Sequence, residues 1–304
     1  PLWSRGLGDV YKRQVFDDGV VMRLADDHFI ATTTTSGAAA VLDHMEEYLQ
    51  TEWPELRVRL ASVTEQWATV AVVGPHARDV LEALAPHEDW SAEGFGFIHH
   101  RVVRIGGGPG RAARVSFSGE LAWELHVDGT HGLALWEAVF AAGEPWDITP
   151  YGTEAMHVLR AEKGYVIVGQ ETDGTVTPYD LGLAWMVAED KPFFVGKRSF
   201  RRADTARPDR KQLVGLLPLD PEDLLPEGAQ LVTDPDAEPP VEMHGHVTSS
   251  YFSVELDRTF ALALLRSGRE RHGEIVYAPL EHGIVAAQVV APVFVDPEGS
   301  RRDG

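Results

Sequence analysis

The chain has 304 residues, of which 44% are hydrophobic and 9% aromatic, and its formal net charge is -20 at pH 7. A chain of this size and composition can bury a large core, and its length favours two domains. The acidic balance disfavours a nucleic-acid partner, because phosphate backbones are bound by clustered Lys and Arg. The absence of cysteine excludes disulfides, thiolate-ligated zinc, Cys-ligated iron–sulfur clusters and a cysteine nucleophile from this chain.

Neither a membrane span nor an export signal is indicated. No stretch approaches the run of about 18 apolar residues that a spanning helix needs, and no basic-then-apolar pattern opens the chain. We therefore expect a cytoplasmic protein without a membrane partner. Residues 1–14 lack an initiator Met and show no continuity with the strand-like pattern after them. We interpret them as a non-native segment, with a native loop as the alternative.

From Val15 onward, strand and helix patterns alternate. An Asp18-Gly19 turn separates two apolar runs, and residues 28–35 continue in a strand-like, β-branched pattern. Ser36 is expected to cap a helix. The apolar face of this helix carries Val41, Leu42, Met45 and Leu49.

The middle of the chain predicts a sheet and three further helices. Strands are expected at residues 67–73, 102–105, 113–117 and 123–127, with a glycine-rich turn over residues 106–110. Gly74-Pro75 is expected to open a helix. The apolar residues expected to face the core from the three helices are Val80, Leu81 and Leu84; Leu133, Trp136, Val139 and Phe140; and Ala155, Val158 and Leu159.

The last third of the chain differs in composition. The charged stretch after Arg201 is the best candidate for a domain boundary. From Leu213 onward, Pro, Gly and Asp separate short strands at the spacing of a small β-barrel or sandwich.

Common catalytic patterns do not occur in the sequence. None of the 13 histidines stands in a His-Glu-x-x-His arrangement, there is no G-x-S-x-G elbow, and no G-x-G-x-x-G follows a strand. We therefore expect no metal site in this chain. Composition and spacing alone indicate a fold class and no reaction.

Five ordered motifs resemble those of the glycine-cleavage T-protein (aminomethyltransferase) family. Residues 116–124 (SFSGELAWE) are similar to the family's Y-T-G-E-x-G-x-E strand, and residues 159–164 (LRAEKG) are similar to its L-R-L-E-A-G helix end. The other three are Thr177-Pro178 with Gly182-Leu183, residues 194–197 (FVGK) and residues 245–249 (GHVTS).

The resemblance implies an α+β fold with a folate-binding module and a small β-barrel. It places a T-protein-like α/β region, incomplete at its start, over residues 15–203 and the barrel over residues 210–299, followed by a tail over residues 300–304.

Within the family, residues 62–75 and 151–185 most resemble sarcosine oxidase large subunits and dimethylglycine dehydrogenases. This resemblance implies that a flavin elsewhere oxidises an N-methyl amine and that tetrahydrofolate, bound here, takes up the one-carbon unit as 5,10-methylenetetrahydrofolate. It also implies other oxidase subunits as partners. FAD, FMN and NAD are expected in the complete complex but not in this chain, which alone is expected to be inactive. A dimethylglycine dehydrogenase-like domain and a non-catalytic folate-binding or docking module are the alternatives.

Three departures argue against other activities within the family. Ala40 stands where the aminomethyltransferases carry a catalytic Asp, and Met156 stands where they carry an Arg. Family members that maintain iron–sulfur enzymes carry a cysteine between the positions of Gly164 and Tyr165, and this chain has none.

The resemblance assigns four candidate folate-binding residues. Glu124 could accept N–H bonds from the pterin edge and Phe117 could form an aromatic wall, whereas Thr32 and Thr33 lie in the loop that lines the family's folate pocket. The alternatives are a solvated strand carboxylate, a core aromatic and β-branched strand residues, respectively. Arg160 with Glu162 is interpreted as a structural ion pair.

Overall fold

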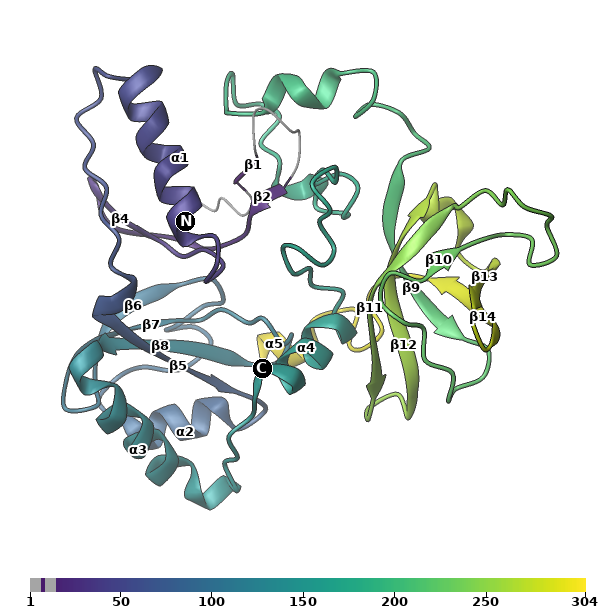
Figure 1. Ribbon diagram of the computed structural model, residues 1–304. Coiled ribbons are helices and arrows are strands. Elements are labelled where there is room, and N and C mark those ends of the chain that lie inside the picture. The colour runs from purple at the N-terminus through teal and green to yellow at the C-terminus, as the bar shows by residue number, and fades with distance from the viewer. Residues whose placement is uncertain (1–6, 9–14) are drawn as a thin grey trace.

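The computed structural model describes residues 7–8 and 15–304 (Figure 1). Most of the segment interpreted as non-native therefore lies outside the described residues. The described part of that segment is β1 (Leu7–Gly8), which pairs antiparallel with β2 (Val15–Asp17).

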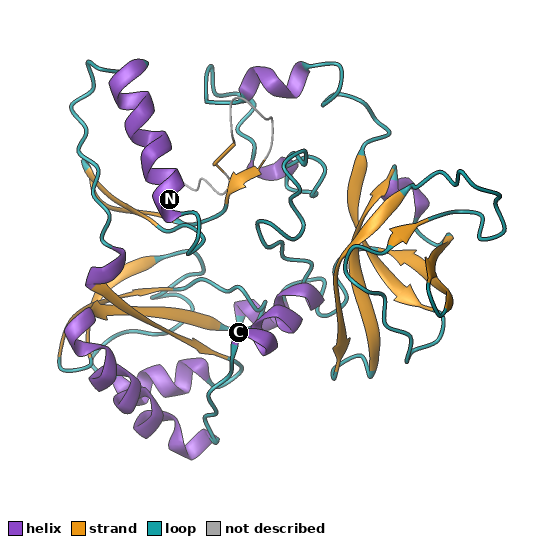
Figure 2. Cartoon of the chain, in the orientation of Figure 1, coloured by secondary structure: helices purple, strands orange, loops and turns teal. Residues whose placement is uncertain are grey.

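The chain forms three bodies joined by irregular segments (Figure 2). The first contains the hairpin of β3 (Val21–Ala25) and β4 (His28–Ala31) together with α1 (Ala38–Thr51). The second is a four-stranded antiparallel sheet in the order β5-β8-β7-β6, and the third is a six-stranded sheet in the order β10-β11-β12-β9-β14-β13. Among the described residues, no helix is long and apolar enough to cross a membrane.

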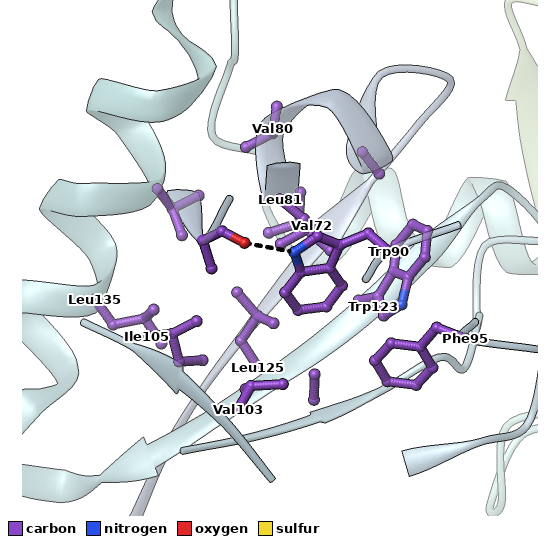
Figure 3. Packing of buried hydrophobic residues seen from close by; sticks show 14 of the residues in the cluster. Val72, Val80, Leu81, Trp90, Phe95, Val103, Ile105, Trp123, Leu125 and Leu135 are labelled. Carbon is purple, nitrogen blue, oxygen red and sulfur yellow. Dashed lines mark hydrogen bonds between the residues drawn. The ribbon is translucent and has the colours of Figure 1, made fainter. Parts of the chain in front are cut away.

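The four-stranded sheet buries one face under two helices. Its strands are β5 (Trp67–Val73), β6 (His100–Ile105), β7 (Gly108–Ala113) and β8 (Ala122–Asp128), and the helices are α2 (Ala77–Leu84) and α3 (Gly132–Gly143). Trp123 and Leu125 of β8 pack here against Trp90 and Phe95 (Figure 3). The Trp90 indole N–H donates to the Ala85 carbonyl at 3.1 Å, which satisfies its polar atom inside this core.

Two sequence predictions fail in this sheet. The turn is shorter than expected, because Gly106 and Gly107 both adopt positive φ angles and close the hairpin in two residues. The remaining glycines of the run therefore belong to β7, and residues 114–117 form a loop instead of a strand.

The helix predictions were right in position and partly wrong in face. Leu135, Val139 and Gly143 are the buried residues of α3, whereas Leu133 and Trp136 are exposed. α4 (Thr153–Glu162) exposes Ala155 and buries its last turn. α1 buries Val41 as predicted but begins after Gly37 without a Ser36 cap, because the Thr34 hydroxyl accepts the Gly37 N–H at 3.1 Å.

The C-terminal sheet closes into the expected barrel. Its strands are β9 (Lys211–Pro218), β10 (Gln230–Leu231), β11 (Gly245–Ser253), β12 (Arg258–Arg266), β13 (Ile275–Leu280) and β14 (Gly283–Val290). Val232 and Tyr277 exchange two backbone hydrogen bonds of 2.9 Å, which join the two ends of the sheet. The last residues form α5 (Ser300–Asp303), which returns to the first part of the chain, where Arg114 donates to the Asp303 carbonyl at 2.6 Å.

A buried ion pair connects α4 to the barrel. Arg160 Nη1 donates to Glu171 Oε2 at 2.8 Å and Nη2 donates to the Ser249 hydroxyl of β11 at 2.7 Å, while Ser249 donates to the other Glu171 oxygen. Both charged side chains are fully buried. The predicted Arg160–Glu162 pair is therefore wrong, because Glu162 accepts instead from the Ser253 hydroxyl at 2.6 Å.

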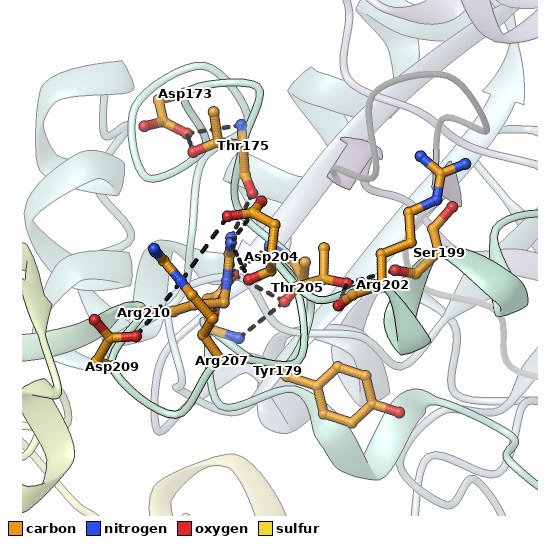
Figure 4. A network of polar contacts seen from close by, with 12 residues as sticks. Asp173, Thr175, Tyr179, Ser199, Arg202, Asp204, Thr205, Arg207, Asp209 and Arg210 are labelled. Carbon is orange, nitrogen blue, oxygen red and sulfur yellow. Dashed lines mark hydrogen bonds and ion pairs between the residues drawn. The ribbon is translucent and has the colours of Figure 1, made fainter.

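A second buried ion pair holds the irregular segment before the barrel. Arg210 donates to Asp180 through Nε and Nη2, and Nη2 also donates to the Thr175 carbonyl at 2.7 Å. Figure 4 shows Arg210 between Thr175 and Asp204. The charged stretch proposed as a boundary thus contains a cation that ties the start of the barrel to the segment before that stretch.

Glu171→Ala should lower the free energy of unfolding by about 3–5 kcal/mol, because it leaves the Arg160 guanidinium buried without a counter-charge. Urea denaturation at pH 7 measures this change. Glu242→Ala, which breaks the exposed Arg266–Glu242 pair of the barrel, is the matched control and should cost under about 1 kcal/mol. Equal losses for the two variants would contradict this assignment.

Candidate functional site

The second face of the four-stranded sheet carries polar residues. Side chains alternate along a strand, so Glu124 and His126 of β8 point away from the core that Trp123 and Leu125 enter. The register places Thr69 of β5 and Arg111 of β7 on either side of His126. Glu124 lies one row further along, between Ala71 and Ala113.

The β3–β4 hairpin covers one side of this face. Its Met22 is buried against Ala113 and Val115, and the His100 Nε2 atom lies 2.9 Å from the Arg23 carbonyl oxygen. On the β5 side, Thr69 and Ala71 are exposed. The polar face is therefore covered around His100 and Ala113, whereas it is open at Thr69 and Ala71, next to Glu124, and at Val102 of β6.

Glu124 is partly accessible on this face. Its side chain is 38% exposed, and its Oε2 lies 3.7 Å from His126 Nε2. Partial burial raises the pKa of Glu124 above its ordinary value. Burial and the Glu124 charge together raise the pKa of the Tyr151 hydroxyl. The carboxylate is thus neither freely solvated nor buried, as a ligand-facing acceptor should be.

Phe117 lies in the loop between β7 and β8 and is 37% exposed, so it is not a core aromatic. Its ring stacks on Tyr165, with centroids 6.4 Å apart and an angle of 30° between the planes. The loop is held by Ser116, whose hydroxyl accepts the Gly119 N–H at 3.0 Å and donates to the Glu120 carbonyl at 2.7 Å. Phe117 and Tyr165 therefore form an aromatic surface, and the sequence did not indicate Tyr165 as part of it.

The two threonines use their hydroxyls inside their own loop. Thr32 Oγ1 accepts the Val20 N–H at 2.9 Å, and Thr33 Oγ1 donates to the Thr34 carbonyl at 2.8 Å. Asp17, which is buried, accepts from both the N–H and the hydroxyl of Thr34. These bonds fix the loop's shape and occupy the hydroxyls.

The four predicted residues are arranged around one apolar cluster, and their side chains have other polar and ring partners. Val20, the partner of Thr32, packs on the cluster that contains Ala113 and Val115. Ala113 is the cross-strand partner of Glu124, and Phe117 follows Val115 by two positions. Among the described residues, no hydrogen bond, ion pair or ring contact joins Thr32, Thr33, Phe117 and Glu124 to each other.

His126 is the polar residue of this face that the sequence analysis missed. It is buried, its Nδ1 lies 2.9 Å from Thr69 Oγ1, and its Nε2 has no hydrogen-bond partner. Burial and the neighbouring Arg111 charge lower the pKa of His126 to about 4. The alternation of β8 already placed it on the same face as Glu124, but its partners come from other strands.

The face combines a carboxylate acceptor with aromatic rings nearby. It suits a flat ligand that offers N–H donors along one edge. Within the described ranges, no group of three or more His, Asp or Glu side chains is placed to hold a metal ion.

This chain belongs to the glycine cleavage T-protein family. Residues 12–191 match the family's GCVT N-terminal domain, and residues 211–296 match its C-terminal barrel domain. The α+β fold and the family assignment expected from the motifs are thereby confirmed.

Its relatives include subunits of an amine oxidase. The chain is similar to sarcosine oxidase subunit alpha of Corynebacterium sp. (strain P-1), with 56% identity over 293 residues that cover 95% of this chain and 30% of that protein. The subunit alpha of Rhizobium meliloti (strain 1021) is 43% identical over 291 residues, which are 94% of this chain and 29% of that protein. Human mitochondrial dimethylglycine dehydrogenase is 31% identical over 207 residues, which are 68% of this chain and 23% of that protein. The chain therefore spans under a third of the length of these relatives.

A solved structure shares the fold. The aminomethyltransferase T of the glycine cleavage system from Bartonella henselae superposes with a TM-score of 0.79 at 23% identity, covering 96% of this chain and 75% of that chain.

His126 should make the protein less stable in acid. Its folded pKa of about 4 lies below the ordinary value of 6.5, so the unfolded chain takes up a proton first as the pH falls. The contribution of neutral His126 to the free energy of unfolding is complete above pH 6.5 and is lost as the pH falls towards 4. The free energy of unfolding should fall by about 2 kcal/mol between pH 7 and pH 5 from this cause.

Chemical denaturation of the parent and of His126→Gln across this range measures the contribution, and the variant should show a flatter profile. His28→Gln removes an exposed histidine of β4 and is the matched control. If His126→Gln retains the full pH dependence of the parent, protonation of His126 does not cause the loss of stability in acid.

Proposed function

We propose that this chain binds tetrahydrofolate on the second face of the four-stranded sheet, with Glu124 as acceptor for the pterin N–H groups. The observation that carries the proposal is a partly exposed carboxylate beside the part of this face that the β3–β4 hairpin covers. Phe117 with Tyr165 would provide an aromatic wall, and Thr32 and Thr33 would shape the loop at the far side of the apolar cluster.

The one-carbon chemistry follows from the ligand. Tetrahydrofolate, when bound, supplies amine nitrogens that take up a one-carbon unit to give 5,10-methylenetetrahydrofolate. The chain's own residues would bind and orient the pterin. Oxidation of sarcosine to release that unit and glycine, with oxygen as acceptor, would occur elsewhere in a heterotetrameric cytoplasmic oxidase carrying FAD, FMN and NAD, and this chain alone would be inactive.

A sarcosine oxidase role is favoured over the dimethylglycine dehydrogenase alternative. The similarity to the sarcosine oxidase subunits reaches 56% over 95% of the chain, against 31% over 68% for the human dehydrogenase. The other subunits of such an oxidase are the proposed partners.

Glu124→Gln should weaken tetrahydrofolate binding about ten- to a hundredfold, because the amide replaces one charged acceptor oxygen with a donor. Isothermal titration under anaerobic conditions measures the Kd. The matched control is Glu82→Gln, an exposed glutamate on α2 behind the opposite face of the sheet, which should bind as the parent does. Equal affinities for Glu124→Gln and the parent would place the pterin elsewhere.

The chain should not replace a T-protein in a reconstituted glycine-cleavage assay. Ala40, on the first turn of α1, has only a methyl group and cannot perform the acid–base work of the Asp that it is aligned with. Aminomethyl transfer from the lipoyl carrier above background would reject that alignment.

A further inference from the structure

A buried histidine lies beneath the candidate pterin acceptor with its outer nitrogen unpartnered. The His126 residue is 9% exposed, and its Nε2 has no hydrogen bond. Glu124 Oε2 lies 3.7 Å from His126 Nε2, just beyond hydrogen-bond length. On the other side of the ring, Thr69 Oγ1 lies 2.9 Å from Nδ1. The three side chains thus form a series from Thr69 of β5 to His126 and then Glu124 of β8, which we call the relay.

The chemistry of a neutral imidazole decides how this relay is bonded. One ring nitrogen donates and the other accepts. If Nδ1 carried the proton, the Nε2 lone pair would face an ionised carboxylate, and the two would repel. If Nε2 carries it, the Thr69 hydroxyl donates to Nδ1 and the Nε2–H points towards Glu124. The adjacent carboxylate therefore selects the second tautomer.

The charges around the ring keep it neutral. Arg111 lies directly across from His126 in β7 and, together with burial, opposes a second proton on the ring. Glu124, Tyr151, Asp128 of β8, and His100 and Arg104 of β6 are further titratable groups on this side. Because the Glu124 side chain is partly exposed, it can rotate through the short distance that would complete a hydrogen bond.

We propose that Thr69 and His126 are positioning residues for Glu124: the Nε2–H of His126 holds one carboxylate oxygen and leaves the other directed at the ligand. The hydrogen bond also favours the ionised carboxylate and so opposes the effect of burial. The identity of the ligand rests on the proposed function, whereas the tautomer and the bond to Glu124 do not.

A double-mutant cycle on tetrahydrofolate affinity tests the proposal. His126→Phe should weaken binding about tenfold and Thr69→Val about threefold, since each removes one member of the relay. In a Glu124→Gln background, neither change should alter the Kd by more than about twofold. Losses of equal size in both backgrounds would show a merely structural role and overturn the proposal.

A second measurement needs neither a ligand nor a change at His126. Long-range ¹H–¹⁵N spectra of the ligand-free protein should show the Nε2–H tautomer, and Glu124→Gln and Thr69→Val should each shift the His126 ring nitrogens. Glu82→Gln should leave them unchanged. An Nδ1–H tautomer, or a ring insensitive to Glu124→Gln, would overturn the proposal. Failure of the parent to bind tetrahydrofolate would instead reject the proposed function. These spectra would still test the tautomer of His126 and its hydrogen bond to Glu124.

Discussion

The arrangement of the protein depends on one buried ion pair, between Arg160 and Glu171. Removing two charges from water is unfavourable unless their hydrogen-bonding capacity is filled. Here Glu171 accepts from Arg160, from the Ser249 hydroxyl and from the Ile167 N–H at 2.7 Å. Because these donors come from α4, from the loop after it and from the barrel, the charges are satisfied only when all three lie together. Figure 1 shows α4 between the sheet and the barrel, where this constraint acts.

The same network extends to the candidate site. Arg160 Nη1 also donates to the Tyr165 carbonyl at 3.0 Å, and the Tyr165 ring stacks on Phe117. Gly164 makes this short connection possible: its φ is +66°, and a Cβ there would lie 2.4 Å from the Pro292 carbonyl oxygen. The contacts that join the barrel to α4 therefore also set the position of the aromatic pair beside the loop that leads into β8.

The four-stranded sheet serves two purposes through its two faces. Trp123 and Leu125 stabilise it by packing under α2 and α3, while Glu124 and His126, one residue away in each case, face the site. A rigid strand holds its side chains more accurately than a loop does, which suits an acceptor that must meet a planar ligand. By the resemblance to the aminomethyltransferases, the chain has Glu124 at an acidic position of the motif and Ala40 at the position of the catalytic Asp. Under our proposal, this combination would suit folate binding without aminomethyl transfer.

Local sequence determined the kinds of elements and, for β8, which side chains lie on each face, whereas it predicted the buried faces of the helices only in part. The alternation in β8, the period of α1 and the short strands of the barrel were readable because apolar periodicity is a property of neighbouring residues. The hairpin at Gly106-Gly107 was misread because a glycine run does not reveal which of its members take positive φ. The family motifs made Glu124 a candidate, but the neighbours of that residue followed only from tertiary structure. Arg160 is hydrogen-bonded to Ser249, which is 89 residues away in the sequence, and His126 lies within hydrogen-bond distance of Thr69, which is 57 residues away. A buried polar group is satisfied by whichever donor or acceptor the packing of distant segments brings to it.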